Sequence, residues 1–295
     1  MTEQELFTRV GIRPQAPSGA EVKPKRGGVP WISLALLGII VLGCLLAGVI
    51  APGDPGYLDL LHGNQPPDRE FLFGTDSLGR DLFACIWHGG RVSLTIGFLA
   101  TAISTFLAVV YGTLSGMAPG WLDTILMRLT EILLSVPSLL LVIFILAILG
   151  EPTVLTISVT IGITSWFSIA KVIRTEVRQI RGSEYVVAAR CMGGGFWYVL
   201  WQHLAPNFVS SIMFMVVMNI RGAITAESTL SFMGMGLPIS VISWGSMLSL
   251  ADRALMTRAW WVILVPGIFL VTLLMCLTNL GNWLRKNVNR KESNL

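Results

Sequence analysis

Residues able to perform catalysis or bind a metal are few in this chain and far apart in the sequence. It has three histidines and four cysteines among 295 residues. His62, His88 and His203 are scattered along the sequence, and no two cysteines have the Cys-x-x-Cys spacing typical of zinc and redox sites. The sequence therefore indicates neither a metal centre nor a disulfide framework, and we expect this chain to bind no metal.

Motifs for nucleotide chemistry and for hydrolysis are also missing from the sequence. A phosphate-binding loop needs Gly-x-x-x-x-Gly-Lys followed by Ser or Thr, and the chain has no Gly-Lys dipeptide at all. An intramembrane peptidase needs a Ser/His pair, paired aspartates or His-Glu-x-x-His within its apolar segments, and these are absent as well. We therefore expect a protein that is not an enzyme and binds no cofactor itself.

The segment 184–207 is a polar island between two strongly apolar stretches. Three consecutive glycines, 193–195, divide it and predict a turn with positive φ between two short helices. Ala188 and Ala189 predict a face of small side chains on the first helix, which another protein can approach closely. Pro206 suits the start of the following helix, because its φ is already fixed near the helical value.

The order of residues in this segment resembles the EAA loop of ABC importer permeases, the cytosolic element that docks in a groove of an ATPase subunit. The resemblance is carried by Glu184, Ala188, Ala189, Gly193, His203, Pro206 and Asn207. Ala205 departs from it, since the peptide-permease branch usually has leucine there. The ATPase-coupling residues that the resemblance implies are Glu184, Tyr185, Ala188, Ala189, Arg190, Gly193, His203 and Pro206. We expect His203 to contact backbone carbonyls at a helix end; a plain polar loop is the alternative for the whole segment.

The composition excludes an ordinary soluble domain and predicts a helical membrane protein. Hydrophobic residues make up 53% of the chain and charged residues 13%, against the ~25% charged residues of soluble domains. A helix that crosses a bilayer needs about 20 apolar residues. Six segments meet this length: Trp31–Ala51, Val92–Ser115, Ile125–Leu149, Thr153–Ile173, Phe208–Phe232 and Trp261–Leu284.

Basic residues predict the orientation of these six helices. Lysine and arginine concentrate in residues 9–26, 171–190 and 285–291, and cytosolic segments carry the excess of such residues. Both termini are therefore expected in the cytosol. The net charge of +4 reflects this bias, and we expect no nucleic-acid partner because no basic run is interleaved with aromatic residues.

A polar run, Phe-Gly-Thr-Asp-Ser-Leu-Gly-Arg-Asp at 73–81, follows the first predicted span. Its residues of interest are Gly74, Thr75, Asp76, Gly79, Arg80 and Asp81. The glycines predict tight turns, the threonine or the first aspartate is suited to cap a short helix, and the three charged residues predict a small ion-pair cluster. The run closely resembles the LGTDxLGRD signature of the C-type permease subunit in dipeptide, oligopeptide and nickel importers. A structural cap and a role in receiving substrate both remain open.

Four charged residues lie within or beside the predicted spans. Arg128 and Glu131 are three apart on one helical face and are expected to pair, and Pro137 is expected to kink the same helix. A charge at the bilayer centre costs ~2.5–3.5 kcal/mol, so Arg221 and Glu227 are expected to face protein or a transport path and not lipid. They point about 120° apart and need separate partners. For Arg221 the candidates are Glu131 and a second permease subunit.

Matches to the same family run from about Phe73 to Arg285, with Asn282 standing where aspartate is usual. The resemblance implies an all-α membrane protein with six transmembrane helices and the MetI-like fold of type I ABC importer permeases. It also implies the partners: a B-type permease that shares the translocation path, two cytosolic ATPases that bind ATP and Mg, an extracytoplasmic solute-binding protein, and the lipid of a prokaryotic plasma membrane. The solute expected is a dipeptide, an oligopeptide, nickel or a metal chelate. A self-contained secondary carrier with two related halves, or a membrane scaffold, is the alternative.

These observations divide the chain into five parts. They are a cytosolic tail 1–30, a peripheral first helix 31–51, an extracytoplasmic segment 52–91, a five-helix core 92–284 that includes the coupling loop 184–207, and a cytosolic tail 285–295. The first helix follows a Lys-Pro-Lys-Arg run, and we expect it to stay uncleaved because its apolar length exceeds that of a signal peptide.

Overall fold

The computed structural model describes residues 28–292, and the regular secondary structure of this part of the chain is helical apart from one isolated β-bridge. The predicted tail 1–30 lies almost wholly outside the described residues. In chain order the helices are α1 (Trp31–Leu45), α2 (Ala47–Ile50), η2 (Leu60–His62), α3 (Leu82–Met117), α4 (Gly120–Ser135), α5 (Ser138–Leu149), α6 (Val154–Ser165), α7 (Phe167–Ile180), α8 (Glu184–Cys191), α9 (Phe196–Val199), the π-helical η3 (Leu200–Leu204), α10 (Ala205–Phe232), α11 (Trp244–Leu248), α12 (Ala251–Met256) and α13 (Trp261–Glu292). The predicted all-α class is confirmed for these residues.

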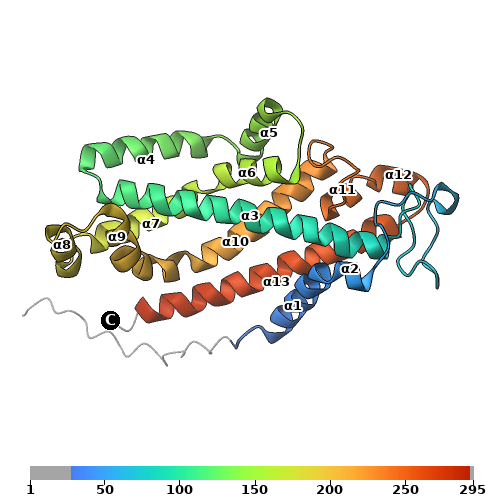
Figure 1. The fold of residues 1–295 in the computed structure, drawn as a ribbon, viewed down its shortest axis with the longest axis horizontal. Helices are drawn as coiled ribbons and strands as arrows, with labels where there is room; N and C mark the ends of the chain where they lie inside the picture. The colour runs from blue at the N-terminus through green and yellow to red at the C-terminus, as the bar shows by residue number, and fades with distance from the viewer. Residues whose placement is uncertain (1–27, 293–295) are drawn as a thin grey trace, which may run out of the picture.

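The longest helix, α3, runs through the middle of the molecule (Figure 1). Helices α6, α7 and α10 pack against it, α10 also packs against α13, and α1 lies against α13 and α3. Helices α8 and α9 gather at one end of the bundle, and α11 and α12 at the other (Figure 1). We name these the α8 end and the α11 end.

Glycines let α3 lie close to α6 and α7. A Cβ added at Gly112 would stand 2.7 Å from the carbonyl oxygen of Ala170, and one at Gly162 would stand 2.9 Å from the carbonyl oxygen of Ala100. Both distances are shorter than any normal contact, so no larger residue fits. Close backbone approach through small residues is a usual way for membrane helices to associate.

Three helical stretches among the described residues are long and apolar enough to cross a membrane. They are α3, the stretch 196–232 formed by α9, η3 and α10, and α13 up to Lys286. Two bent pairs, α4 with α5 and α6 with α7, raise the number to five if each pair is one span. Helix α1 has only 15 residues and is separated from α2 by Leu46. The structure thus supports three to five candidate spans, where the sequence predicted six.

The third predicted span, 125–149, is not one straight helix. Helices α4 and α5 meet at Val136 and Pro137 with a bend of 90°. The predicted kink at Pro137 is confirmed, and it is sharp enough to separate two helices. Proline lacks the N–H that would continue the hydrogen-bond ladder, and it drives the preceding residue out of the helical region; Val136 has ψ 130°.

The fourth predicted span, 153–173, also bends, by 44° at Trp166, although it contains no proline. Thr164 and Ser165 just before the bend donate their hydroxyls to carbonyls three or four residues back; the Ser165 bond to the Ile161 oxygen is 2.6 Å long. Such bonds compete with the backbone ladder and bend helices. The bend lets α7 run along α3 toward the α8 end.

Candidate functional site

Helix α8 turns one face outward at its end of the bundle (Figure 1). Its exposed residues are Glu184, Tyr185, Val187, Ala188, Arg190 and Cys191. Val186 and Ala189 point inward and are almost completely buried. The expectation that both neighbouring alanines face a partner is therefore wrong for Ala189, because consecutive residues of a helix point about 100° apart. The small residue on the outward face is Ala188.

The turn after α8 uses its glycines in different ways. Gly193 has φ +85°, which confirms the predicted left-handed turn. The N–H of Gly194 donates to the Ala189 oxygen at 2.9 Å and closes the helix end, and a Cβ on Gly194 would stand 2.7 Å from that oxygen. Gly195 has an ordinary φ of −68° and begins α9. The two short helices predicted on either side of this turn are present.

The inward side of α8 belongs to a buried apolar cluster. Val186 and Ala189 pack there with Val177 of α7 and with Leu200 and Leu204 of η3. Each of these five side chains is at most 2% exposed. Since such a core is close-packed and deforms little, a force on the outward face of α8 moves α7 and the start of α10 with it.

His203 lies between two tyrosines that tie α8 to α9. Its ring centroid is 6.0 Å from that of Tyr185 and 5.6 Å from that of Tyr198, within the range of aromatic pairs. In the described part of the chain the ring makes no hydrogen bond to a carbonyl, so the expected carbonyl contact is wrong. Pro206 lies in the first turn of α10, as predicted.

A buried carboxylate links the segment before α8 to the turn between α3 and α4. Asp123, which is 3% exposed, accepts hydrogen bonds from Nε of Arg174 at 2.6 Å and from Nη1 of Arg178 at 2.7 Å. It also accepts one from Oγ of Ser115 at 2.6 Å. One carboxylate thus joins α3, α4 and α7. Charge-assisted hydrogen bonds of this kind are stronger than hydrogen bonds between neutral groups.

Arg181 extends this linkage to the residues that lead into α8. Its Nη1 donates to the carbonyl oxygens of Gly116 and Ala118 at 3.0 and 3.1 Å. We call Asp123 with Arg174, Arg178 and Arg181 the arginine clamp. Basic residues in this region predicted only the orientation of the chain. The spacing of these three arginines, four and then three residues, places them on one helical face, and this was the signal in the sequence for a shared partner.

The polar run 73–81 forms a compact and mostly buried loop at the α11 end. Nε of Arg80 donates to Oδ2 of Asp76 at 2.7 Å, and Nη1 of Arg80 donates to the Ile239 oxygen at 3.1 Å. Asp81 does not join this ion pair, because it caps α3 by accepting from the N–H of Phe83 at 3.0 Å. The predicted helix cap is therefore Asp81 and neither Thr75 nor Asp76.

Thr75 and Gly74 lie against Trp261 of α13, and Gly79 lies against the backbone of Asp59. The Thr75 carbonyl oxygen accepts from Nε1 of Trp261 at 3.0 Å, and its hydroxyl contacts the His62 carbonyl. Gly74 and Gly79 have φ 75° and 73°, which confirms the predicted turns. Thr75, Asp76 and Arg80 use their side chains for bonds within the chain, which favours the structural cap over direct contact with a substrate. The buried hydroxyl of Ser77 is the exception, since it has no hydrogen-bond partner among the described residues.

Two of the charged residues in the predicted spans pair as expected. Nη1 of Arg128 donates to Glu131 at 3.1 Å, and Nζ of Lys171 is 4.0 Å from the same carboxylate. The suggested pairing of Glu131 with Arg221 is therefore wrong. Arg221 lies on an exposed part of α10, so nothing within the described chain buries it.

Glu227 is completely buried in protein, as expected. Its Oε1 accepts from the hydroxyls of Ser243 at 2.7 Å and Ser231 at 3.0 Å. Its Oε2 lies 3.3 Å from the hydroxyl of Ser228 and 3.4 Å from that of Ser93. Ser228 and Ser231 are near Glu227 on α10, whereas Ser93 comes from α3 and Ser243 from the N-cap of α11, and no local spacing in the sequence predicts these two contacts.

The helical bundle with three to five candidate spans and the outward α8 are typical of a transporter's membrane subunit. The chain belongs to the family of binding-protein-dependent transport system inner membrane components, whose model matches residues 108–293. It is therefore a multi-pass permease of a bacterial inner membrane and a non-catalytic subunit. This membership excludes the self-contained carrier and the scaffold.

Two relatives cover most of the chain. The oligopeptide transport system permease protein OppC of Bacillus subtilis is 34% identical over 242 residues, 82% of this chain and 79% of the relative. The dipeptide transport system permease protein DppC of the same organism is 32% identical over 267 residues, 90% of this chain and 83% of the relative.

Proposed function

We propose that this chain is the C-type permease of an ABC importer for dipeptides or oligopeptides. The names of its relatives, oligopeptide and dipeptide permeases, support this solute class over nickel or a metal chelate. The observation that carries the proposal is the outward face of α8, held on a core shared with α7 and η3. A protruding helix on a stiff base is suited to receive motion from an ATPase subunit.

The chain crosses the membrane six times in this proposal, with both termini in the cytosol and the MetI-like fold of type I importers. The first span is α1 with α2, since the backbone bonds from Leu46 to Leu42 at 2.9 Å and from Ile50 to Leu46 at 3.0 Å continue the helical pattern through the break. Together the two helices have about the 20 residues that a span needs. The bent pairs α4–α5 and α6–α7 supply two further spans.

The partners in this proposal are a B-type permease, two cytosolic ATPases that carry ATP and Mg, and an extracytoplasmic solute-binding protein. The translocation path runs between the two permeases along α10. A hollow of about 290 Å³ between α6, α7 and α10 is lined in part by Ser165, Ser168 and Asn219, and the exposed Arg221 follows on the same helix. Polar groups at membrane depth usually mark such a path.

Charge reversal at the start of α8 tests the docking role. Glu184→Lys removes an acidic group that suits the helix N-terminus and places a positive charge on the docking face. We expect the ATPases to be lost on purification of the complex, and the uptake of a labelled dipeptide to fall with them. Gln179→Lys, an exposed change on α7, is the control and should leave both intact. Full co-purification and uptake with Glu184→Lys would contradict the docking assignment.

A further inference from the structure

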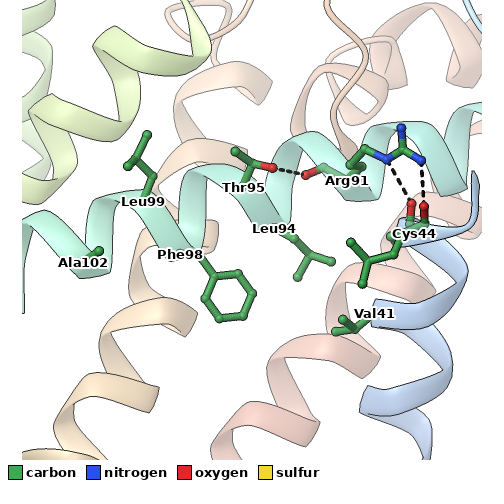
Figure 2. Close-up of a pocket in the computed structure, with 9 residues that line it drawn as sticks. Val41, Cys44, Arg91, Leu94, Thr95, Phe98, Leu99 and Ala102 are labelled. Carbon is green, nitrogen blue, oxygen red and sulfur yellow. Dashed lines mark hydrogen bonds between the residues drawn. The ribbon is translucent and has the colours of Figure 1, made fainter.

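A groove runs along the outside of α3, where α1 and α10 leave it uncovered. Its first part has a volume of about 530 Å³ and reaches along α3 from Arg91 to Ala102 (Figure 2). A second hollow of about 470 Å³ shares Phe98 and Ala102 with the first and continues toward Trp201. Apart from Arg91 and Thr95, the first part is lined by apolar side chains.

Arg91 brings an unneutralised positive charge to one end of this groove. Its Nε and Nη2 donate to the carbonyl oxygens of Cys44 and Leu45 at 3.1 and 2.9 Å (Figure 2). These carbonyls lie at the end of α1, where the helix gives them no regular partner. They are neutral acceptors, and within residues 28–292 no carboxylate forms an ion pair with Arg91. The side chain is exposed, so Nη1 remains free for an anion from outside the chain.

The Thr95 hydroxyl does not change the character of the groove, because it donates to the Arg91 carbonyl oxygen at 2.8 Å. Leu94 and Phe98 extend from α3 toward the side on which α1 lies (Figure 2). From Arg91 to Ala102 the helix rises about 16 Å, close to the ~15 Å of hydrocarbon in one leaflet. The groove therefore has a cation at one end and apolar walls to the depth of a single leaflet.

We propose that this groove is a binding site for one phospholipid, whose phosphate binds Arg91 and whose acyl chain lies along Leu94, Phe98 and Ala102. A guanidinium binds phosphate oxygens through paired charge-assisted hydrogen bonds. With both termini in the cytosol, as proposed above, Arg91 lies at the outer side of the membrane and the lipid belongs to the outer leaflet. The lipid site itself does not depend on this orientation. A helix of the second permease is the competing occupant, and it would have to place an anionic side chain at the level of Arg91, at the cost of burying a charge.

Photolabelling of the intact transporter tests this site. The complex is placed in nanodiscs of phosphatidylcholine with a fraction of phosphatidylglycerol that carries a diazirine in its acyl chain. We expect label on the peptide that contains Phe98 and Ala102. Arg91→Gln should lower this labelling about tenfold, the factor expected for one lost charge-assisted bond, whereas Arg91→Lys should keep most of it.

Two further variants keep the result interpretable. Ala102→Trp fills the groove, leaves Arg91 in place and should also lower the labelling. Arg253→Gln removes an exposed arginine on α12 and should not change it. Normal elution and normal ATPase co-purification establish that each variant is folded, so the outcome is independent of the docking role of α8. Equal labelling in the wild type, Arg91→Gln and Ala102→Trp would overturn the proposal, and so would a photo-crosslinking residue at Phe98 that reacts with the second permease instead of lipid.

Discussion

Oγ of Ser243 donates a 2.7 Å hydrogen bond to Oε1 of the buried Glu227. The same Oγ accepts from the N–H of Ser246 at 3.0 Å as the N-cap of α11, so its proton is directed at the carboxyl group. Trp244, the next residue, donates its N–H to Oγ of Ser93 at 3.2 Å, and that hydroxyl also faces Glu227. The last turns of α10, the short α11 and α3 are thereby fastened to one acidic side chain.

Ser243→Ala should therefore destabilise the α11 end. The variant loses a hydrogen bond to a buried carboxyl group and the N-cap of α11, together worth about 2 kcal/mol or more. Thermal unfolding of the purified complex in detergent measures the effect as a lower midpoint. Ser210→Ala, at an exposed serine on α10, the helix that carries Glu227, is the control. If the two variants unfold at the same temperature, the Ser243–Glu227 bond does not contribute as argued.

The arginine clamp gives a second prediction. Asp123→Asn keeps the shape of the side chain and removes the charge that Arg174 and Arg178 share, so the free energy of unfolding should fall by about 1–3 kcal/mol; Arg178 is partly exposed, which limits the effect. Because the clamp fixes α7 just before α8, uptake should fall while the ATPases still co-purify.

Glu131→Gln is the comparison for the clamp, since its pairs with Arg128 and Lys171 are exposed and surface pairs contribute at most about 1 kcal/mol. Wild-type uptake and stability in Asp123→Asn would mean that the clamp does not position α8.

Features encoded over a few neighbouring residues were predictable. The kink at Pro137, the left-handed Gly193 and the start of α10 near Pro206 each depend on one residue's backbone preference, and all three are present. The pairing of Arg128 with Glu131 follows from helical spacing alone. The insertion cost of a charge predicted that Glu227 is buried, without saying what surrounds it.

Features that depend on distant partners were not predictable. Ser243 and Ser93 meet Glu227 from 16 and 134 residues away, and Asp123 meets Arg174 across 51 residues. The inward position of Ala189 depends on how α8 packs on the bundle, which the sequence of α8 does not specify. The bend at Trp166 arises from competing hydroxyl bonds whose net effect is set by tertiary packing.

The loop between α2 and α3 should respond to pH. Nδ1 of His62 lies 2.7 Å from Oδ2 of Asp59, and this hydrogen bond raises the pKa of His62 and lowers the pKa of Asp59. Folding raises the pKa of His62. The stabilisation from its pair with Asp59 is therefore fully present below the unfolded-state pKa of about 6.5, and it is lost as the pH rises through the folded-state pKa. The depressed pKa of Asp59 keeps its side of the pair charged until the pH falls well into the acid range.

Proteolysis within residues 52–72 of the folded complex should therefore accelerate as the pH rises above about 6.5 and through the raised pKa of His62. The His62 side chain is exposed and that of Asp59 is partly exposed, so the change is expected to be small. In His62→Gln this pH dependence should disappear. A rate that stays constant across the range in the wild type, after correction for the protease's own pH profile, would contradict the assignment.

The turn after α8 allows a matched comparison of two glycines. Nothing lies within 4 Å of a Cβ added at Gly193 or at Gly195, but Gly193 has φ +85° and Gly195 has φ −68°. Gly193→Ala should therefore cost about 1–2 kcal/mol through backbone strain alone, whereas Gly195→Ala should be neutral. Gly193→Pro should be more severe, because proline cannot adopt a positive φ. Co-purification of the ATPases and dipeptide uptake should fall in the order Gly195→Ala, Gly193→Ala, Gly193→Pro. If Gly195→Ala is as defective as Gly193→Ala, the defect comes from added bulk at a docking surface, and the strained turn is not what sets the position of α8.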